Sequence, residues 1–217
     1  MDLDYTIRRS PRARRVRVAV DANAGVQVTL PARAREREAA VAVAELRPWI
    51  ERRIAEVRAA RERLAVPAGH VPYLGAQLAL MPEPGRQRAH RRGDALLVPD
   101  HDARPAIERW YRRAAREEIA PRLDEAVAAV GRTYTKLTIR EQRTRWGSCS
   151  TTGAMSFNWR LLLGPEDVLD YVIWHEACHL VVMDHSRRFW SLLARHRPGY
   201  RGPQRWLRAN GPALVLP

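Results

Sequence analysis

Two histidines and a glutamate with a fixed spacing are the residues of this chain most able to do chemistry. The stretch from His175 to His179 has the form H-E-x-x-H and lies inside an apolar run from Tyr171 to Val182. Residues four apart share one face of a helix, so both imidazoles can reach a single metal ion. Glu176 is rotated by about 100° from His175, close enough to act on a water at that ion. Because neutral imidazole is a good zinc ligand, the stretch predicts a zinc hydrolase.

A buried helix with two hydrogen-bonded histidines is the alternative interpretation of the same pattern. The residues around the polar triplet are apolar on almost every side of the predicted helix. Burying two histidines and a glutamate in such a helix costs free energy unless they are paired or coordinate something. A metal ion meets this requirement for all three, so we favour the metal site.

A catalytic zinc site usually has three protein ligands and one open position. No Asp or Glu follows Asp184, which excludes a distant downstream glutamate as the third ligand. The candidates are Asp184, His185 and His196. His185 completes the spacing H-E-x-x-H-x5-H of the longer metzincin motif and is the predicted third ligand, with His196 in reserve. Asp184 can instead orient a ligand imidazole from behind.

The position where the metzincin motif has a glycine is Val182 in this chain. A β-branched residue is strained at the positive φ that a sharp glycine turn uses. We therefore expect the chain to leave the metal helix by a different turn, through Met183 and Asp184.

Elements on both sides must position these groups, and their periodicity predicts an α+β protein. The sequence predicts strands, then helical segments, then a mixture of the two. The expected strands are 5–7, 16–20, 26–30, 71–81, 95–98, 136–140 and 154–159, with a turn at 23–25, and the expected helices are 32–64, 103–130, 166–182, 186–195 and 204–210. Pro48 starts or kinks a helix, and Pro121 marks a bend or a restart. We expect an N-terminal β-rich region with a helix over residues 1–100, packed on a catalytic domain over 101–217.

Length and composition set the class of protein. The 217 residues are enough for one domain, or one domain with an appendage, and the 46% of hydrophobic residues suffice for a packed core. Cys149 and Cys178 are too few for a disulfide scaffold and suggest free thiols in a reducing compartment. An acidic start without an apolar stretch predicts no secretory signal, and no segment is long enough to span a membrane. We expect a cytoplasmic protein with no membrane partner.

The formal net charge of +14 is unevenly distributed along the chain. Lys136 is the only lysine, so nearly all of the basic residues are arginine, as a GC-rich coding sequence would also produce. Residues 185–217 hold seven arginines and no acid. This basic C-terminal region predicts an electropositive surround for the metal helix and makes nucleic acid a possible partner. A solvated basic face explains the same residues equally well.

Several longer motifs resemble one known family. They are R-W-G-S-C at 145–149, F-N-W-R-L at 157–161, the metal helix at 171–180, D-H-S at 184–186 and F-W at 189–190. Together they resemble the YgjP-like metallopeptidase family, which is similar to the SprT and WLM groups of zincins. The resemblance is densest over 140–207. It implies a compact zincin-like metallopeptidase with a small mixed β-sheet, a backing helix and a metal-binding active-site helix. It also implies that His175, His179 and His185 bind the metal and that Glu176 is the catalytic acid/base.

Three hypotheses on function follow. The first is a zinc metallopeptidase that hydrolyses a polypeptide through a metal-activated water with Glu176 as general base. The strand Ala154–Phe157 is then the sheet edge that receives the substrate, and Tyr200, Arg145 and Asn158 are candidates for stabilising the oxyanion.

The second hypothesis is a metal-dependent nucleotide phosphohydrolase, which the arginines favour, although no phosphate-cradling glycine loop is present. The third is a nucleic-acid-associated module with a structural metal, although such a site usually has four protein ligands. The first and third hypotheses combine in a peptidase that acts on DNA-associated proteins.

Overall fold

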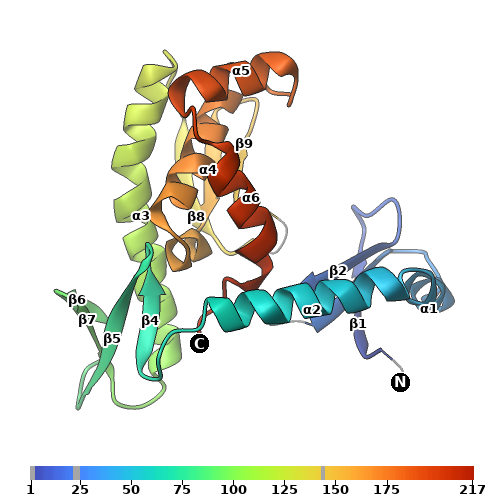
Figure 1. Cartoon of the computed structure of the whole chain (residues 1–217), viewed down its shortest axis with the longest axis horizontal. Helices are drawn as coiled ribbons and strands as arrows, with labels where there is room; N and C mark the ends of the chain where they lie inside the picture. The colour runs from blue at the N-terminus through green and yellow to red at the C-terminus, as the bar shows by residue number, and fades with distance from the viewer. Residues whose placement is uncertain (1–2, 22–24, 143–144) are drawn as a thin grey trace. The chain divides into compact units, whose positions relative to one another are not determined.

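The computed structural model describes residues 3–21, 25–142 and 145–217 (Figure 1). The expected turn residues Asn23 and Ala24 lie outside this part of the chain. Two compact units are present: the first comprises residues up to Ala65 together with Arg208–Val215, and the second comprises Val66–Leu207 with Leu216–Pro217. These units divide the chain at Ala65, whereas the predicted division into an N-terminal region and a catalytic domain was placed at residue 100. That division by role stays a prediction.

The first unit is a three-stranded sheet with helices on one face. Its strands β1 (Tyr5–Ser10), β2 (Arg17–Asp21) and β3 (Gly25–Pro31) lie in the order β1-β3-β2, with β1 parallel and β2 antiparallel to β3. Alternate residues of β3 are buried, as the period of a strand requires, and they form a core with buried residues of α1 (Glu36–Glu45) and α2 (Arg47–Arg63). Pro48 lies in the first turn of α2, so it starts a second helix as predicted.

The second unit begins with a four-stranded sheet and a long helix. The strands β4 (His70–Tyr73), β5 (Ala76–Glu83), β6 (His90–Arg92) and β7 (Ala95–Pro99) have the order β4-β5-β7-β6. The helix α3 (Ala103–Ala129) is continuous through Pro121, where a bend or restart was expected. Proline removes only one backbone hydrogen bond, and buried residues on both sides of it, including Ile119 and Leu123, hold the helix against the core.

A second sheet in this unit contains the strands nearest to the metal helix. Strands β8 (Lys136–Arg140), β9 (Gly147–Cys149) and β10 (Ala154–Asn158) have the order β8-β10-β9. Since β10 pairs with β8 on one side and with β9 on the other, the prediction that Ala154–Phe157 is a sheet edge is wrong. The edges of this sheet are β8 and β9.

The remaining elements are helical. They are η1 (Trp159–Leu163), α4 (Glu166–His179), which is the predicted metal helix, α5 (Arg187–His196), α6 (Arg201–Asn210) and η2 (Gly211–Ala213). Helix α3 runs alongside α4 as the expected backing helix (Figure 1). Small mixed sheets combined with these helices confirm the predicted α+β class. In the described part of the chain, no helix has both the length and the apolar character that crossing a bilayer requires.

Candidate metal centre

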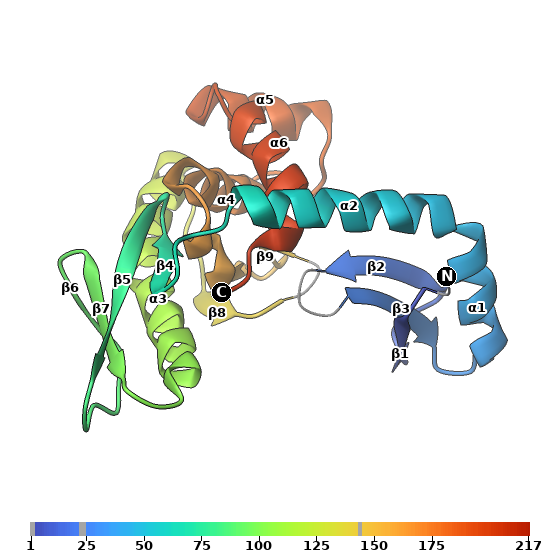
Figure 2. The same ribbon diagram turned by 60° about the horizontal axis from the view of Figure 1, so that its bottom comes forward.

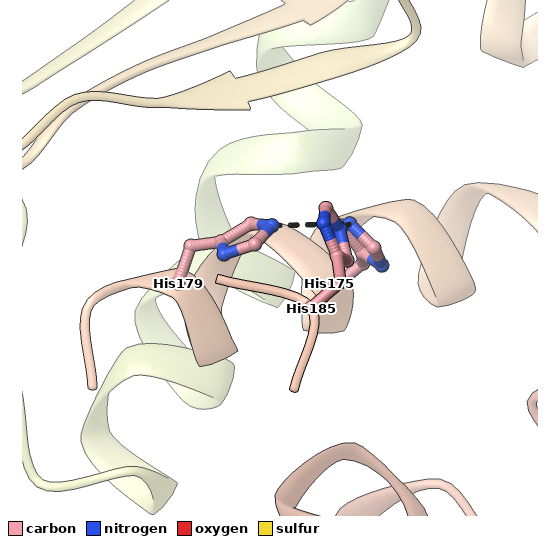
Figure 3. A group of neighbouring side chains, drawn as sticks. All are labelled: His175, His179 and His185. Atoms are coloured by element: carbon pink, nitrogen blue, oxygen red, sulfur yellow. Dashed lines mark hydrogen bonds between the residues drawn. The ribbon is translucent and has the colours of Figure 1, made fainter. Parts of the chain in front are cut away.

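Three imidazoles converge at the end of α4 (Figure 3). The Nε2 atom of His175 lies 3.2 Å from Nε2 of His179 and 3.0 Å from Nε2 of His185. Within the described residues, these three histidines form a group whose ligand atoms all lie within 4.8 Å of one another. His196 is outside the group and stacks on Trp174, with ring centroids 5.1 Å apart, so we drop it as a reserve ligand.

The chain after α4 fixes which ring nitrogen of His179 carries the proton. The Nδ1–H of His179 donates to the carbonyl oxygen of Val182 at 3.0 Å, which leaves the lone pair on Nε2 facing the other two rings. None of residues 180–185 adopts a positive φ. The helix therefore ends without a glycine turn, as the presence of Val182 predicted.

Short contacts hold the loop of His185. The Asp184 carboxylate accepts a hydrogen bond from the backbone N–H of Ser186 at 3.0 Å, and the Trp190 indole N–H donates to the carbonyl of His185 at 3.0 Å. Asp184 therefore shapes the loop that presents His185, where the sequence suggested that it orients an imidazole.

Aromatic rings enclose the cluster, and burial favours the neutral form of His175 and His179. Phe189 stacks on His179 with centroids 4.5 Å apart and meets His175 edge-on at 4.8 Å. Burial, followed by the neighbouring His179 and His185, lowers the pKa of His175 to about 3. Burial likewise lowers the pKa of His179. Metal ligation needs the neutral form of histidine, so the lowered pKa values of His175 and His179 favour binding of a cation.

The residues fit a metal ion. An ion bound tetrahedrally at 2.0–2.1 Å from each nitrogen separates the nitrogens by about 3.4 Å, close to the two shortest separations here. Facing lone pairs repel unless a cation or a shared proton lies between them, and His179 already uses its proton on Val182. His185 is exposed, and its ligand atom lies within 4.8 Å of those of the other two histidines.

Glu176 is buried beside this cluster, with 6% of its surface exposed. Strand β9 packs directly on it: a Cβ added to Gly147 would lie 2.6 Å from both Cγ and Oε1 of Glu176. Burial raises the pKa of Glu176 to about 8, while the charge of Arg145 and a hydrogen bond from the backbone N–H of Cys149 act in the opposite direction. Gly147 was missed in the sequence, although glycine inside a short strand often marks a close approach.

The three oxyanion candidates have different surroundings. Asn158 is buried, and its side-chain amide donates to the carbonyls of Gln142 and Arg145 and accepts from the backbone N–H of Arg160. It positions the segment around Arg145, and we no longer propose it as an oxyanion donor. Arg145 is exposed, and its charge acts on Glu176.

Tyr200 is buried, and its ring connects to the cluster through Trp190. Its ring stacks on that of Trp190 at 5.5 Å, and the Trp190 ring is 5.6 Å from that of His185. Tyr171, which the sequence analysis did not single out as a site residue, lies closer: its ring is 5.8 Å from that of His175.

Comparison with known proteins agrees with this geometry. A family model described as the YgjP-like metallopeptidase domain matches residues 14–210. The chain belongs to the YgjP-like metallopeptidase family. This confirms the resemblance inferred from the motifs, and membership in a YgjP-like metallopeptidase family implies a peptidase hydrolase that uses a metal ion and acts on polypeptides.

Among solved structures, the YgjP-like chain is similar to the metallopeptidase zymogen of Pyrococcus abyssi abylysin. The identity is 22% and the TM-score is 0.38, and the match covers 42% of this chain and 92% of that one. No curated protein matches the chain.

Proposed function

We propose that this chain is a zinc-dependent, zincin-like peptidase in which His175, His179 and His185 hold the ion and Glu176 is the general base. The observation that supports this proposal most is a buried carboxylate next to three convergent imidazole nitrogens. A zinc ion held there lowers the pKa of a bound water and polarises the scissile carbonyl. Three histidine ligands leave one position open, which favours a catalytic over a structural metal.

Glu176 is suited to moving a proton. Its burial favours proton uptake, since the charged form loses its hydration there. The carboxylate can therefore accept a proton from the attacking water and deliver it to the leaving nitrogen. The backbone N–H of Cys149 holds the carboxylate in place between these two steps.

We place the polypeptide substrate along β9 rather than along β10. β9 is an edge strand in the described sheet and contacts α4 through Gly147 and Glu176. An extended peptide can add to such an edge by main-chain hydrogen bonds. Arg145, just before β9, remains the first candidate for stabilising the oxyanion, and Tyr200 the second.

The test is the Glu176→Gln variant, assayed on an unstructured protein and analysed for metal. We expect the variant to bind about one zinc per chain, as the wild type does. Its kcat should fall by about 10²- to 10⁴-fold, which is roughly the rate acceleration that a general base contributes. Asp167→Asn is the matched control, because Asp167 is an exposed carboxylate at the start of the same helix. Full activity in Glu176→Gln would refute the mechanism.

The other hypotheses are weaker after this comparison. Membership in a peptidase family favours peptide hydrolysis over nucleotide hydrolysis, and phosphate release from a nucleotide panel checks that choice with the same protein. We propose the cytoplasm as the place of action, supported by the free thiols of Cys149 and Cys178.

A further inference from the structure

The first unit carries an arginine run, from Arg8 to Arg17, that the proposed chemistry does not use. The alternation of side chains along β1 sorts this run into two groups. Arg9 lies opposite Leu30 of β3, on the face that packs against the helices. Its guanidinium donates to the carbonyls of Ala32 at 3.2 Å and Ala34 at 2.6 Å and lies 3.8 Å from the Glu36 carboxylate. Arg9 therefore has a structural role in the first unit.

Arg8 and Arg17 lie on the opposite face of the same sheet. Both are register partners of Thr29, Arg8 from β1 and Arg17 from β2. The three residues form one row across the sheet, and two strand spacings separate the arginines by about 10 Å. Helix α2 runs along the other face of the sheet (Figure 2). Arg8 and Arg17 are exposed and form no ion pair with any described residue.

Three further arginines extend this row at the same end of the sheet. Arg12, Arg14 and Arg15 lie in the connection between β1 and β2, and all three are exposed. In the described residues none of them has an acidic partner. The acids nearby in sequence are engaged or lie at the other end of the sheet. Glu36 pairs with Arg9, and Glu38 accepts the backbone N–H of Arg35. Asp4 precedes β1 and Asp21 ends β2, opposite Gly25, so both are at the end of the sheet remote from the connection that holds Arg12, Arg14 and Arg15.

The other side chains on this face indicate which kind of polyanion the face can bind. Thr6, Ala19, Gln27 and Thr29 share the face by register, and none of them is aromatic. Proteins that hold single-stranded nucleic acid stack its bases on aromatic rings, which this face lacks. Unpaired guanidinium groups without stacking or base-reading partners are suited to phosphates on a duplex.

We propose that the helix-free face of the β1-β3-β2 sheet, with Arg8, Arg12, Arg14, Arg15 and Arg17, binds the backbone of double-stranded nucleic acid without reading its sequence. This surface lies in the first unit, whereas six of the seven arginines of the basic C-terminal region belong to the second. The proposal does not depend on the peptidase mechanism.

The test measures binding of the full chain to a short fluorescent DNA duplex between ~50 and ~200 mM salt. Each lost phosphate contact reduces the slope of log K against log salt by about 0.9, so Arg8→Gln with Arg17→Gln reduces it by about 2. The triple variant Arg12→Gln, Arg14→Gln and Arg15→Gln should reduce it by about 3. Arg195→Gln with Arg205→Gln is the charge-matched control in α5 and α6 and should leave the slope nearly unchanged.

Several results would overturn the proposal. One is no duplex binding by the wild type at the lowest salt. A second is an equal loss in the Arg195/Arg205 control, which would assign binding to the C-terminal region or to net charge. A third is binding of anionic vesicles or of single strands in preference to the duplex. Because Arg8 and Arg17 are exposed and unpaired, we expect the melting temperatures of the variants to match the wild type.

Discussion

At the scale of single residues, Gly147 leaves a space that Glu176 fills. The backbone of Gly147 does not have a positive φ, so alanine is conformationally acceptable there and the restriction is steric. A Cβ at this position would meet Cγ, Cδ and Oε1 of Glu176 within 2.8 Å. The glycine of the R-W-G-S-C segment therefore determines where the proposed general base can lie.

Gly147→Ala should displace Glu176 while leaving the three histidines in place. We expect about 10²-fold lower kcat, the size of effect that a misplaced catalytic group produces, with zinc content unchanged. Overpacking should also destabilise the fold by about 1–3 kcal/mol. Glu176→Ala removes the side chain that the added methyl group would meet. In a chain that already carries Glu176→Ala, Gly147→Ala should therefore change the free energy of unfolding in urea very little. An equal loss of unfolding free energy with and without Glu176→Ala would show that the effect of Gly147→Ala does not come from its contact with Glu176.

The histidine cluster could be predicted from sequence because its spacing is local. His175, Glu176, His179 and His185 lie on one helix and the loop after it, where the period of a helix decides which side chains meet. The roles of Gly147 and Asn158 could not be predicted, because each depends on how other elements pack around α4.

At the scale of elements, an arginine of α3 holds the metal helix. Arg122 contacts Glu118 on its own helix and Glu166 and Asp170 on α4, and Asp170 also pairs with Arg197 after α5. These groups are partly exposed, so solvent screens them, but one cation serves several carboxylates. The network fixes the first half of α4 against its backing helix.

Replacing Arg122 by methionine should destabilise the protein by about 1–2 kcal/mol, more than an isolated surface pair contributes. Arg58→Met is the control, because Arg58 and Glu62 form a single exposed pair on α2, and we expect it to cost less than about 0.5 kcal/mol. Urea unfolding at neutral pH measures both. Similar losses in the two variants would mean that the network does not stabilise α4.

The same network predicts an acid sensitivity. Burial opposes ionisation of Glu118, but hydrogen bonds from Arg122 and Tyr73 outweigh it and hold the pKa below its ordinary value of 4.5. A depressed pKa in the folded state stabilises the protein above the unfolded value, and this stabilisation is lost as pH falls through the folded value. Glu118→Gln should therefore flatten the decline of unfolding free energy below about pH 4.5. An equally steep decline of the unfolding free energy at acid pH in the wild type and in Glu118→Gln would contradict this prediction.

The identity of the elements was more predictable than their order. The strand at 154–159 was expected from its own residues, but its central place in the sheet depends on which segments pair with it. A strand carries no local signal of its neighbours, so β10 was expected at an edge, although β8 and β9 are the edge strands.

At the scale of the whole molecule, all three candidate ligands belong to the second unit. If the two units unfold separately, only one thermal transition should respond to zinc. At a hundredfold excess over the dissociation constant, zinc should stabilise that unit by about 2.7 kcal/mol, and a chelator should reverse the shift. Calorimetry of the wild type and of His185→Ala checks this. Two transitions that move together would indicate a single cooperative fold.

The division into these units was not visible in the sequence. Segment Arg208–Val215 belongs with the first unit although it follows the second along the chain. The strands of both units are recognised by the same alternating pattern, which does not show to which unit a strand belongs. Membership in a unit is decided by packing partners far away in the chain.

The three candidate ligands also come from one short stretch, His175–His185, whereas the strand that packs on Glu176 is β9, far upstream in the chain. Under the proposed mechanism, a molecule can therefore bind its metal ion while the strand over the proposed general base is still undocked. The metal content of a purified batch would then overstate the fraction of active molecules. Specific activities should be normalised to a titration of turnover-competent sites.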